Sequence, residues 1–158
     1  MNLDFLSPAL GDPDPRSPLA RALEGSDVRD LSLVHGVVDV RGDLEGLEME
    51  GVEVVRLSAE RSLVLCPYRD APSLRDWLAA QGIVAVVVSG GFAGLEVEGE
   101  AVLRRLTELP LDRLPAAGMV GHVSAVVLRT GDRFRLLFRQ EYADYMGELL
   151  RDTLEGVA

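Results

Sequence analysis

The sequence predicts an α+β fold, in which two small ββα-type halves each pack antiparallel strands against helices. Strand-like runs occur in pairs separated by short turns, rather than alternating singly with helices as in a parallel sheet. The two later strand–strand–helix units are alike in length, which suggests an internal duplication. The chain has 158 residues, 47% of them apolar, which suffices for a sizeable core. We expect one domain over residues 19–158, with sub-halves over about 19–82 and 83–158.

The N-terminal segment is predicted to be an extended arm over residues 1–18. Residues 7–18 contain four prolines, and each proline removes a backbone donor and fixes its own φ. Such an arm suits contact with a partner, which makes Arg16 and Pro18 interface candidates.

The first half is predicted to contain strands over residues 31–40, 52–57 and 61–66 and a helix over residues 72–81. Gly36 marks a possible bend in the first strand. The spacing of Leu74, Trp77 and Leu78 puts these side chains on one side of the helix, and Gly82 ends it.

The second half begins with an apolar run over residues 83–89, which predicts a central, buried strand. Gly90 and Gly91 follow, and a hairpin turn with positive φ is favoured over a phosphate-binding loop because a strand, not a helix, comes next. The remaining elements are predicted as strands over 95–98, 123–129 and 134–139 and helices over 99–106 and 141–154. The last helix carries Tyr145, Leu149 and Leu150 at core spacing.

The charge and composition exclude several classes of function. The formal net charge of -10 argues against nucleic acid and against anionic membrane surfaces. All 16 basic residues are arginine, so lysine Schiff bases and P-loop lysines are excluded. This arginine usage has two explanations, nucleotide bias in a GC-rich genome and selection for ion pairs.

Cysteine and hydropathy indicate a reducing cytoplasm as the simplest compartment. Cys66 is the single cysteine, so no internal disulfide forms, and its apolar surroundings predict a buried side chain. The longest apolar run, residues 83–88, is far shorter than a membrane span of about 20 residues. The first charged residue is the acidic Asp4, whereas a secretory signal begins with basic residues.

Few side chains are candidates for catalysis or metal binding. His35 and His122 each lack a second ligand at metal-binding spacing, so both are interpreted as structural. Acidic residues are frequent between residues 43 and 53, without the order of a calcium loop, which predicts a solvated acidic loop. The sequence predicts no catalytic residue and no metal site.

Four arginines lie across the predicted last hairpin, at Arg129, Arg133, Arg135 and Arg139. Two interpretations remain open. They form a solvated edge that resists aggregation, or they form an interface for another protein, since arginine is enriched at interfaces.

Several motifs in chain order resemble the gamma subunit of heterotetrameric sarcosine oxidase. They are Arg-Ser-Pro-Leu-Ala at 16–20, Val-Arg-Gly-Asp at 40–43, Gly-Leu-Glu-Val-Glu-Gly at 94–99, Pro-Leu-Asp-Arg-Leu at 110–114 and Phe-Arg-Leu-Leu-Phe-Arg at 134–139. The similarity runs from about residue 16 to about residue 154, with a shortened stretch after Asp43. It implies the aminomethyltransferase folate-binding fold, a tandem of ferredoxin-like halves.

The resemblance also implies a non-catalytic role beside larger flavin-binding subunits. Such a complex oxidises sarcosine to glycine and passes the one-carbon unit to tetrahydrofolate. FAD, FMN, NAD and tetrahydrofolate are expected in the partner subunits, and no cofactor is expected on this chain. A Tyr-Thr-Gly-Glu-like folate turn of related enzymes corresponds here to residues 129–132, which makes Thr130, Gly131 and Asp132 weak candidates for folate contact. The alternatives are a separate folate or small-ligand binding protein and a homo-oligomeric scaffold.

Overall fold

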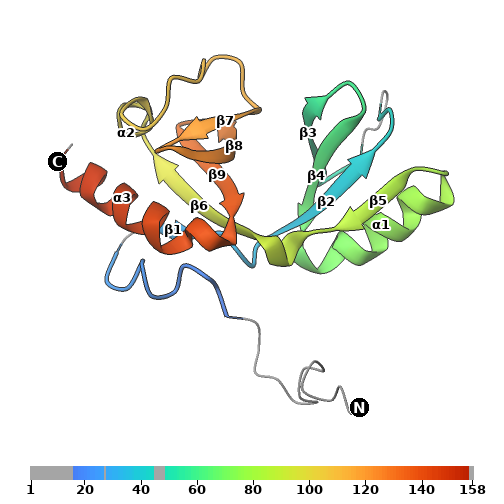
Figure 1. Ribbon diagram of the computed structural model, residues 1–158, viewed down its shortest axis with the longest axis horizontal. Helices are drawn as coiled ribbons and strands as arrows, with labels where there is room; N and C mark the ends of the chain where they lie inside the picture. Colours follow the sequence, from blue (N-terminus) through green and yellow to red (C-terminus); the bar gives the residue numbers. More distant parts are fainter. Residues whose placement is uncertain (1–15, 27, 45–48, 157–158) are drawn as a thin grey trace, which may run out of the picture.

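The computed structural model contains two antiparallel sheets that face each other, with helices on the outer side of each sheet (Figure 1). It describes residues 16–26, 28–44 and 49–156. The strand pairings that it describes are antiparallel. The predicted α+β class, with antiparallel sheets packed by helices, is therefore confirmed.

The four-stranded sheet is covered on its outer face by one helix. In spatial order it consists of β3 (Glu53–Ser58), β4 (Arg61–Pro67), β2 (His35–Arg41) and β5 (Val84–Val87). A 3-10 turn, η2 (Tyr68–Asp70), leads into α1 (Ala71–Ala80). Val38 and Val40 of β2 pack against Leu74 and Leu78 of this helix. Pro72 lies in the first turn of α1, where its fixed φ is compatible with the helix.

The five-stranded sheet has the larger core. Its spatial order is β1 (Arg29–Asp30), β6 (Phe92–Glu98), β9 (Arg133–Arg139), β8 (Val123–Thr130) and β7 (Ala116–Val120). The helical elements are α2 (Glu100–Arg104), the 3-10 turn η4 (Gln140–Tyr142) and α3 (Ala143–Glu155). Alternate residues of β9, Phe134, Leu136 and Phe138, are fully buried and join Met146 and Leu150 of α3 in one cluster.

The turn over residues 18–25 closes this core from the N-terminal side. Leu19 and Leu23 are buried in the same cluster as α3. Gly147 of α3 permits this packing, because a Cβ at that position would lie 2.7 Å from the Cβ of Ala22. The helix therefore packs between the sheet and the N-terminal turn.

A third cluster joins the inner faces of the two sheets. The four-stranded sheet contributes Val37, Val55, Leu63 and Leu65, and the five-stranded sheet contributes Val126, Leu128 and Leu137. These strands have apolar residues on both faces, so their sequences do not alternate with polar residues. Each such side chain stabilises the fold by about 1.5 to 3 kcal/mol through burial. The two sheets are therefore held together by apolar contact over part of their inner faces.

The structure corrects two predictions about the middle of the chain. The strand predicted as central, β5, lies at the edge of the four-stranded sheet, and Val84 and Val86 are 62% and 56% exposed. An apolar run does not distinguish an edge strand from a central strand, because one face of β5 is packed in either position. Here Ala85 and Val87 pack toward α1. The predicted hairpin at Gly90 and Gly91 is also wrong. Neither has positive φ, and the 3-10 turn η3 (Ser89–Gly91) leads from one sheet to the other.

Smaller differences follow from long-range pairing. The strand predicted over 31–40 begins only at His35, because the backbone amide of Leu31 donates to the carbonyl of Gly94 at 2.8 Å and the chain turns before β2. The short strand β1 pairs with β6 in the five-stranded sheet, and β5 pairs with β2 in the four-stranded sheet, so the sheets do not follow the predicted division at residue 82. Gly36 lies inside β2, where a Cβ would approach that of Ala71 to 2.8 Å.

Some side chains expected in the core are at the surface. Trp77 and Tyr145 are exposed and Leu149 is half-buried, whereas their predicted companions Leu74, Leu78 and Leu150 are buried. Each exposed residue lies at the margin of the apolar stripe of its helix. Most of the predicted N-terminal arm lies outside the described residues.

Candidate functional site

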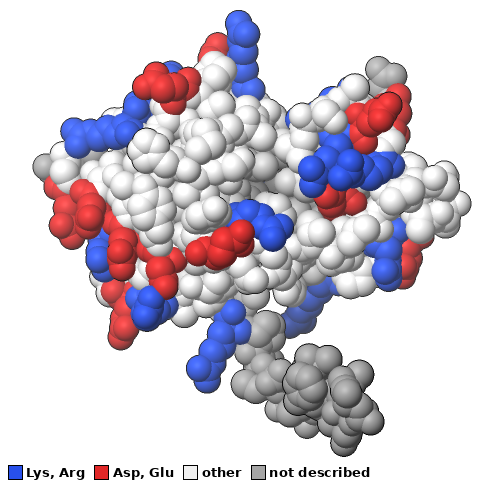
Figure 2. Space-filling model, viewed as in Figure 1, with Lys and Arg blue, Asp and Glu red and all other residues white. Residues whose placement is uncertain are grey.

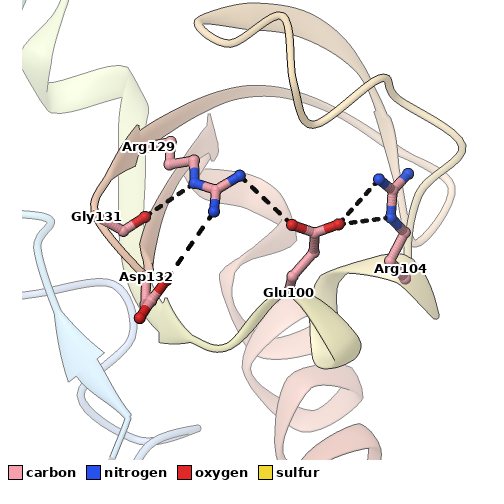
Figure 3. Close-up of polar contacts among 5 residues, drawn as sticks. All are labelled: Glu100, Arg104, Arg129, Gly131 and Asp132. Carbon is pink, nitrogen blue, oxygen red and sulfur yellow. Dashed lines mark hydrogen bonds and ion pairs between the residues drawn. The ribbon is translucent and has the colours of Figure 1, made fainter.

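The turn between β8 and β9 holds Thr130, Gly131 and Asp132, the weak candidates for folate contact (Figure 3). Gly131 takes a φ of 61°, and the Nε of Arg129 donates to its carbonyl oxygen at 2.9 Å. Arg129 also forms ion pairs with Glu100 at 3.4 Å and Asp132 at 4.0 Å. Arg104 donates to the other oxygen of Glu100 at 2.9 Å. The turn is therefore braced against the start of α2.

This arrangement leaves the carboxylate of the turn in water. The side chain of Asp132 is 92% exposed, and its ion pair with Arg129 is at the limit of such contacts. Exposed pairs of this kind contribute about 0 to 1 kcal/mol. Contact of Thr130, Gly131 and Asp132 with folate stays a prediction.

The four arginines of the β8–β9 hairpin each meet a different carboxylate. Arg129 pairs with Glu100, Arg133 with Glu96, Arg135 with Glu53 and Arg139 with Glu141. They do not form one block of unpaired positive charge, and Figure 2 shows charged side chains in separate groups of mixed sign on a largely uncharged face. An interface role for these arginines stays a prediction, as it does for Arg16, which is exposed, and Pro18, which is half-buried.

Arg135 differs from the others because it links the two sheets. Its guanidinium donates twice to Glu53 of β3, at 2.7 and 2.8 Å, and its side chain is only 12% exposed. The Nε atom is buried without a hydrogen-bond partner among the described residues. Bidentate arginine–carboxylate pairs of this type are among the stronger polar contacts in proteins. The pair fixes β3 against β9 beside the contact between the two sheets.

His35 lies near this pair, and its surroundings disfavour its protonated form. Burial lowers the pKa of His35 below its ordinary value, and the positive charge of Arg135 lowers it further. Cys66 is buried beside the carbonyl of Gly36, and burial raises the pKa of its thiol, which disfavours the reactive thiolate. Among the described residues no cluster of three His, Cys, Asp or Glu side chains could hold a metal ion. No described helix is long and apolar enough to cross a membrane.

A cavity of about 200 Å³ lies between the inner faces of the sheets. Leu57, Leu63, Phe92, Val126 and Leu137 are among its apolar lining residues. Its polar lining residues are Asp39, Arg61, Ser124 and Arg139. Asp39 and Arg61 face each other across β2 and β4 in a bidentate pair, with distances of 3.1 and 2.6 Å. Hydrogen bonding from Arg61 lowers the pKa of the Asp39 carboxyl group.

Sequence reasoning missed both the Arg135–Glu53 pair and this cavity. A polar residue within an otherwise apolar strand was the available signal, since Asp39 interrupts the run from Val37 to Val40. The sequence does not show which arginine reaches it, because that depends on strand register. The partner of Arg135 lies 82 residues away.

Comparison with known proteins supports the fold. No protein-family model matches the sequence, and no curated protein matches it. A chain of heterotetrameric sarcosine oxidase from Corynebacterium sp. U-96, solved in complex with pyrrole 2-carboxylate, superposes with a TM-score of 0.74 at 16% identity, over 90% of this chain and 95% of that one. The chain has the fold of this sarcosine oxidase chain. The resemblance found in the sequence motifs therefore extends to three dimensions.

Two further solved structures share the fold more distantly. The ligand-free regulatory subunit of aspartate kinase from Thermus thermophilus has a TM-score of 0.50 at 16% identity, over 81% of this chain and 97% of that one. A structure of the aspartokinase alpha and beta subunits has the same TM-score and coverage at 10% identity. At these identities the likeness concerns the fold alone.

Proposed function

We propose that this chain is a non-catalytic, gamma-like subunit of a sarcosine-oxidase-like flavoprotein complex. The observation that carries the proposal is the superposition with a heterotetrameric sarcosine oxidase chain over nearly the full length of both chains. The sequence motifs point to the same group independently of the coordinates. In such a complex the larger subunits would carry FAD, FMN, NAD and tetrahydrofolate and would oxidise sarcosine to glycine.

The chemistry of the described residues agrees with a supporting role. The thiol of Cys66 is buried with a raised pKa, and the pKa of His35 is lowered by burial and by Arg135. Most hairpin arginines are engaged by carboxylates on the same chain. We therefore assign no catalytic residue to this chain.

The surface offers an apolar region of the kind that partners bury. Val84 and Val86 of the edge strand β5 are more than half exposed, and the described residues place no further strand beside β5. Trp77 on the helix that packs on this strand is exposed as well. We call Val84 and Val86 the valine edge. Exposed apolar side chains at a strand edge favour association with another protein.

Co-expression tests the proposal directly. A tagged form of this chain is produced together with the larger FAD- and FMN-binding chains of a sarcosine-oxidase-like complex and analysed by native mass spectrometry. The expected result is a stoichiometric assembly with sarcosine-dependent peroxide formation, and lower yield or activity when this chain is omitted. Isolation of this chain as a lone monomer, with the larger chains fully active without it, would contradict the proposal.

A further inference from the structure

The cavity between the sheets combines an apolar interior with charged groups that differ in how well they are paired. The four-stranded sheet and the residue after its strand β5 contribute apolar lining residues, namely Leu57, Leu63 and Val88. The five-stranded sheet contributes Phe92, Val126 and Leu137. Sites for drug-sized ligands usually measure about 300 to 1,000 Å³. A volume of about 200 Å³ therefore suits a ligand with a small apolar body.

The Asp39 carboxylate is already neutralised within the protein. Both of its oxygens accept hydrogen bonds from Arg61, at 3.1 and 2.6 Å. A cationic ligand would compete with this guanidinium for the same oxygens. An amine is therefore disfavoured as the charged group of an occupant.

Arg139 is the cation with spare hydrogen-bonding capacity at this cavity. Its guanidinium makes no hydrogen bond to the described part of the chain, and its ion pair with the exposed Glu141 spans 3.6 Å. The guanidinium carbon lies 6.0 Å from the ring centre of Phe92, so the side chain extends over one lining residue. Arg139 is thus positioned at the border between the apolar lining and water.

Ser124 supplies a second donor beside it. Ala125 of β8 pairs with Phe138 of β9, so the next step of the antiparallel register brings Ser124 alongside Arg139 on the same face. Both residues line the cavity. A planar carboxylate matches a guanidinium and a neighbouring hydroxyl in geometry and in charge.

We propose that this cavity binds a small monocarboxylic acid with an apolar body. The carboxylate pairs with Arg139 and Ser124, and the apolar body lies between the two sheets against Leu57 and Val126. Binding involves this chain alone, so it is measured on the isolated protein and does not depend on the presence of partner subunits.

Titration with phenylacetate tests the proposal. In protein labelled at leucine and valine methyl groups, NMR should show saturable shifts at Leu57, Leu63, Val126 and Leu137, with a dissociation constant of about 1 mM or tighter for a fragment of this size. Phenylethylamine and 2-phenylethanol have similar apolar bodies, and both should bind at least about tenfold more weakly, since a charge-assisted hydrogen bond contributes roughly a factor of ten or more. Absence of saturable shifts with phenylacetate, or equal binding of the amine, overturns the proposal.

Three variants locate the site. Arg139→Gln should weaken phenylacetate binding about tenfold, whereas Arg133→Gln, an exposed arginine of the same strand outside the cavity lining, should leave it unchanged. Ala117→Phe adds a ring at an exposed lining position and should abolish binding. If Ala117→Phe fails to fold, the Arg139 and Arg133 pair still decides the result. Equal weakening by both arginine variants would indicate a nonspecific effect of charge and would contradict the site.

Discussion

Each of the two sheets has a part of its inner face that the other sheet does not cover. The side chains on these two uncovered parts differ in chemistry. On the five-stranded sheet the exposed part carries Glu96 between Arg29 and Arg133, with ion-pair distances of 3.3 and 3.4 Å. On the four-stranded sheet it carries the valine edge, Val84 and Val86. The charges of the first surface are paired with one another, whereas the second surface exposes apolar area at an open strand edge. Under the proposed function, the valine edge is therefore the expected site of partner binding.

The largest expected effect concerns the valine edge. The double variant Val84→Glu with Val86→Glu should weaken association with the larger subunits by about 2 to 4 kcal/mol, roughly 30- to 1,000-fold, because unpaired charges would be buried at the interface. Affinity is measured by surface plasmon resonance with immobilised larger subunits. The isolated variant should unfold at nearly the wild-type temperature, since both positions are exposed.

The matched control changes the other edge. Arg133→Gln removes an exposed charge from the surface that already has its own ion pairs, and we expect less than about 0.5 kcal/mol of lost affinity. Equal losses in the two variants would show that the contrast between the edges does not determine partner binding.

The second prediction tests how tightly the helix side of the four-stranded sheet is closed. Gly36→Ala places a Cβ 2.8 Å from that of Ala71 and 3.1 Å from the carbonyl oxygen of Pro67. Both neighbours are rigid, so we expect a loss of about 1 to 3 kcal/mol in the free energy of unfolding, measured by urea denaturation. Gly90→Ala is the control, because no atom lies within 4 Å of its Cβ position and its φ is not positive. A Gly36→Ala protein as stable as wild type would show that α1 can move away from the sheet to make room for the added methyl group.

The sequence predicted most of the strands and both long helices because their signals are local. The pair of strands β3 and β4 follows from two apolar runs at hairpin-like spacing, and the helix α1 follows from helix spacing within a few positions. The edge position of β5 and the inter-sheet pair of Arg135 with Glu53 depend instead on which strands become neighbours. A run such as Val84 to Val87 has the same composition at a sheet edge as at its centre. The proposed partner surface depends on the exposed half of that run, and only the strand order reveals that exposure.

The third prediction concerns the ion pair between Glu53 and Arg135, which lies beside the apolar contact between the sheets. Glu53→Gln removes the charge that pairs with the nearly buried guanidinium of Arg135, whose Nε already lacks a partner among the described residues. We expect a loss of about 1 to 2 kcal/mol in the free energy of unfolding, because a buried cation is left with a weaker acceptor.

A double-mutant cycle with Arg135→Met isolates this interaction from changes in packing. Glu100→Gln serves as the control, since Glu100 and its two arginine partners are all substantially exposed, and its effect should stay below about 0.5 kcal/mol. A coupling energy near zero in the Glu53–Arg135 cycle would mean that the two sheets are held together by apolar contact alone.

The smallest expected effect is a pH dependence that arises near the same ion pair. Burial lowers the pKa of His35 below its ordinary value of 6.5, Arg135 and Arg29 lower it further, and Glu53 and Glu96 oppose them. The unfolded chain therefore binds the proton more readily than the folded one just below pH 6.5. It follows that the histidine's contribution to stability is complete above pH 6.5 and is lost as the pH falls below that value.

In His35→Gln the free energy of unfolding should fall less steeply than in the wild type between about pH 7 and pH 5, and the difference between the two proteins should be constant above pH 7. Urea denaturation across this range measures both slopes. Parallel stability curves for the two proteins throughout this range would show that water reaches His35 freely. The contact between the sheets would then not extend as far as His35. A steeper wild-type curve would show that burial and the nearby guanidinium groups disfavour the protonated form of His35 in the folded protein, beside the contact between the two sheets.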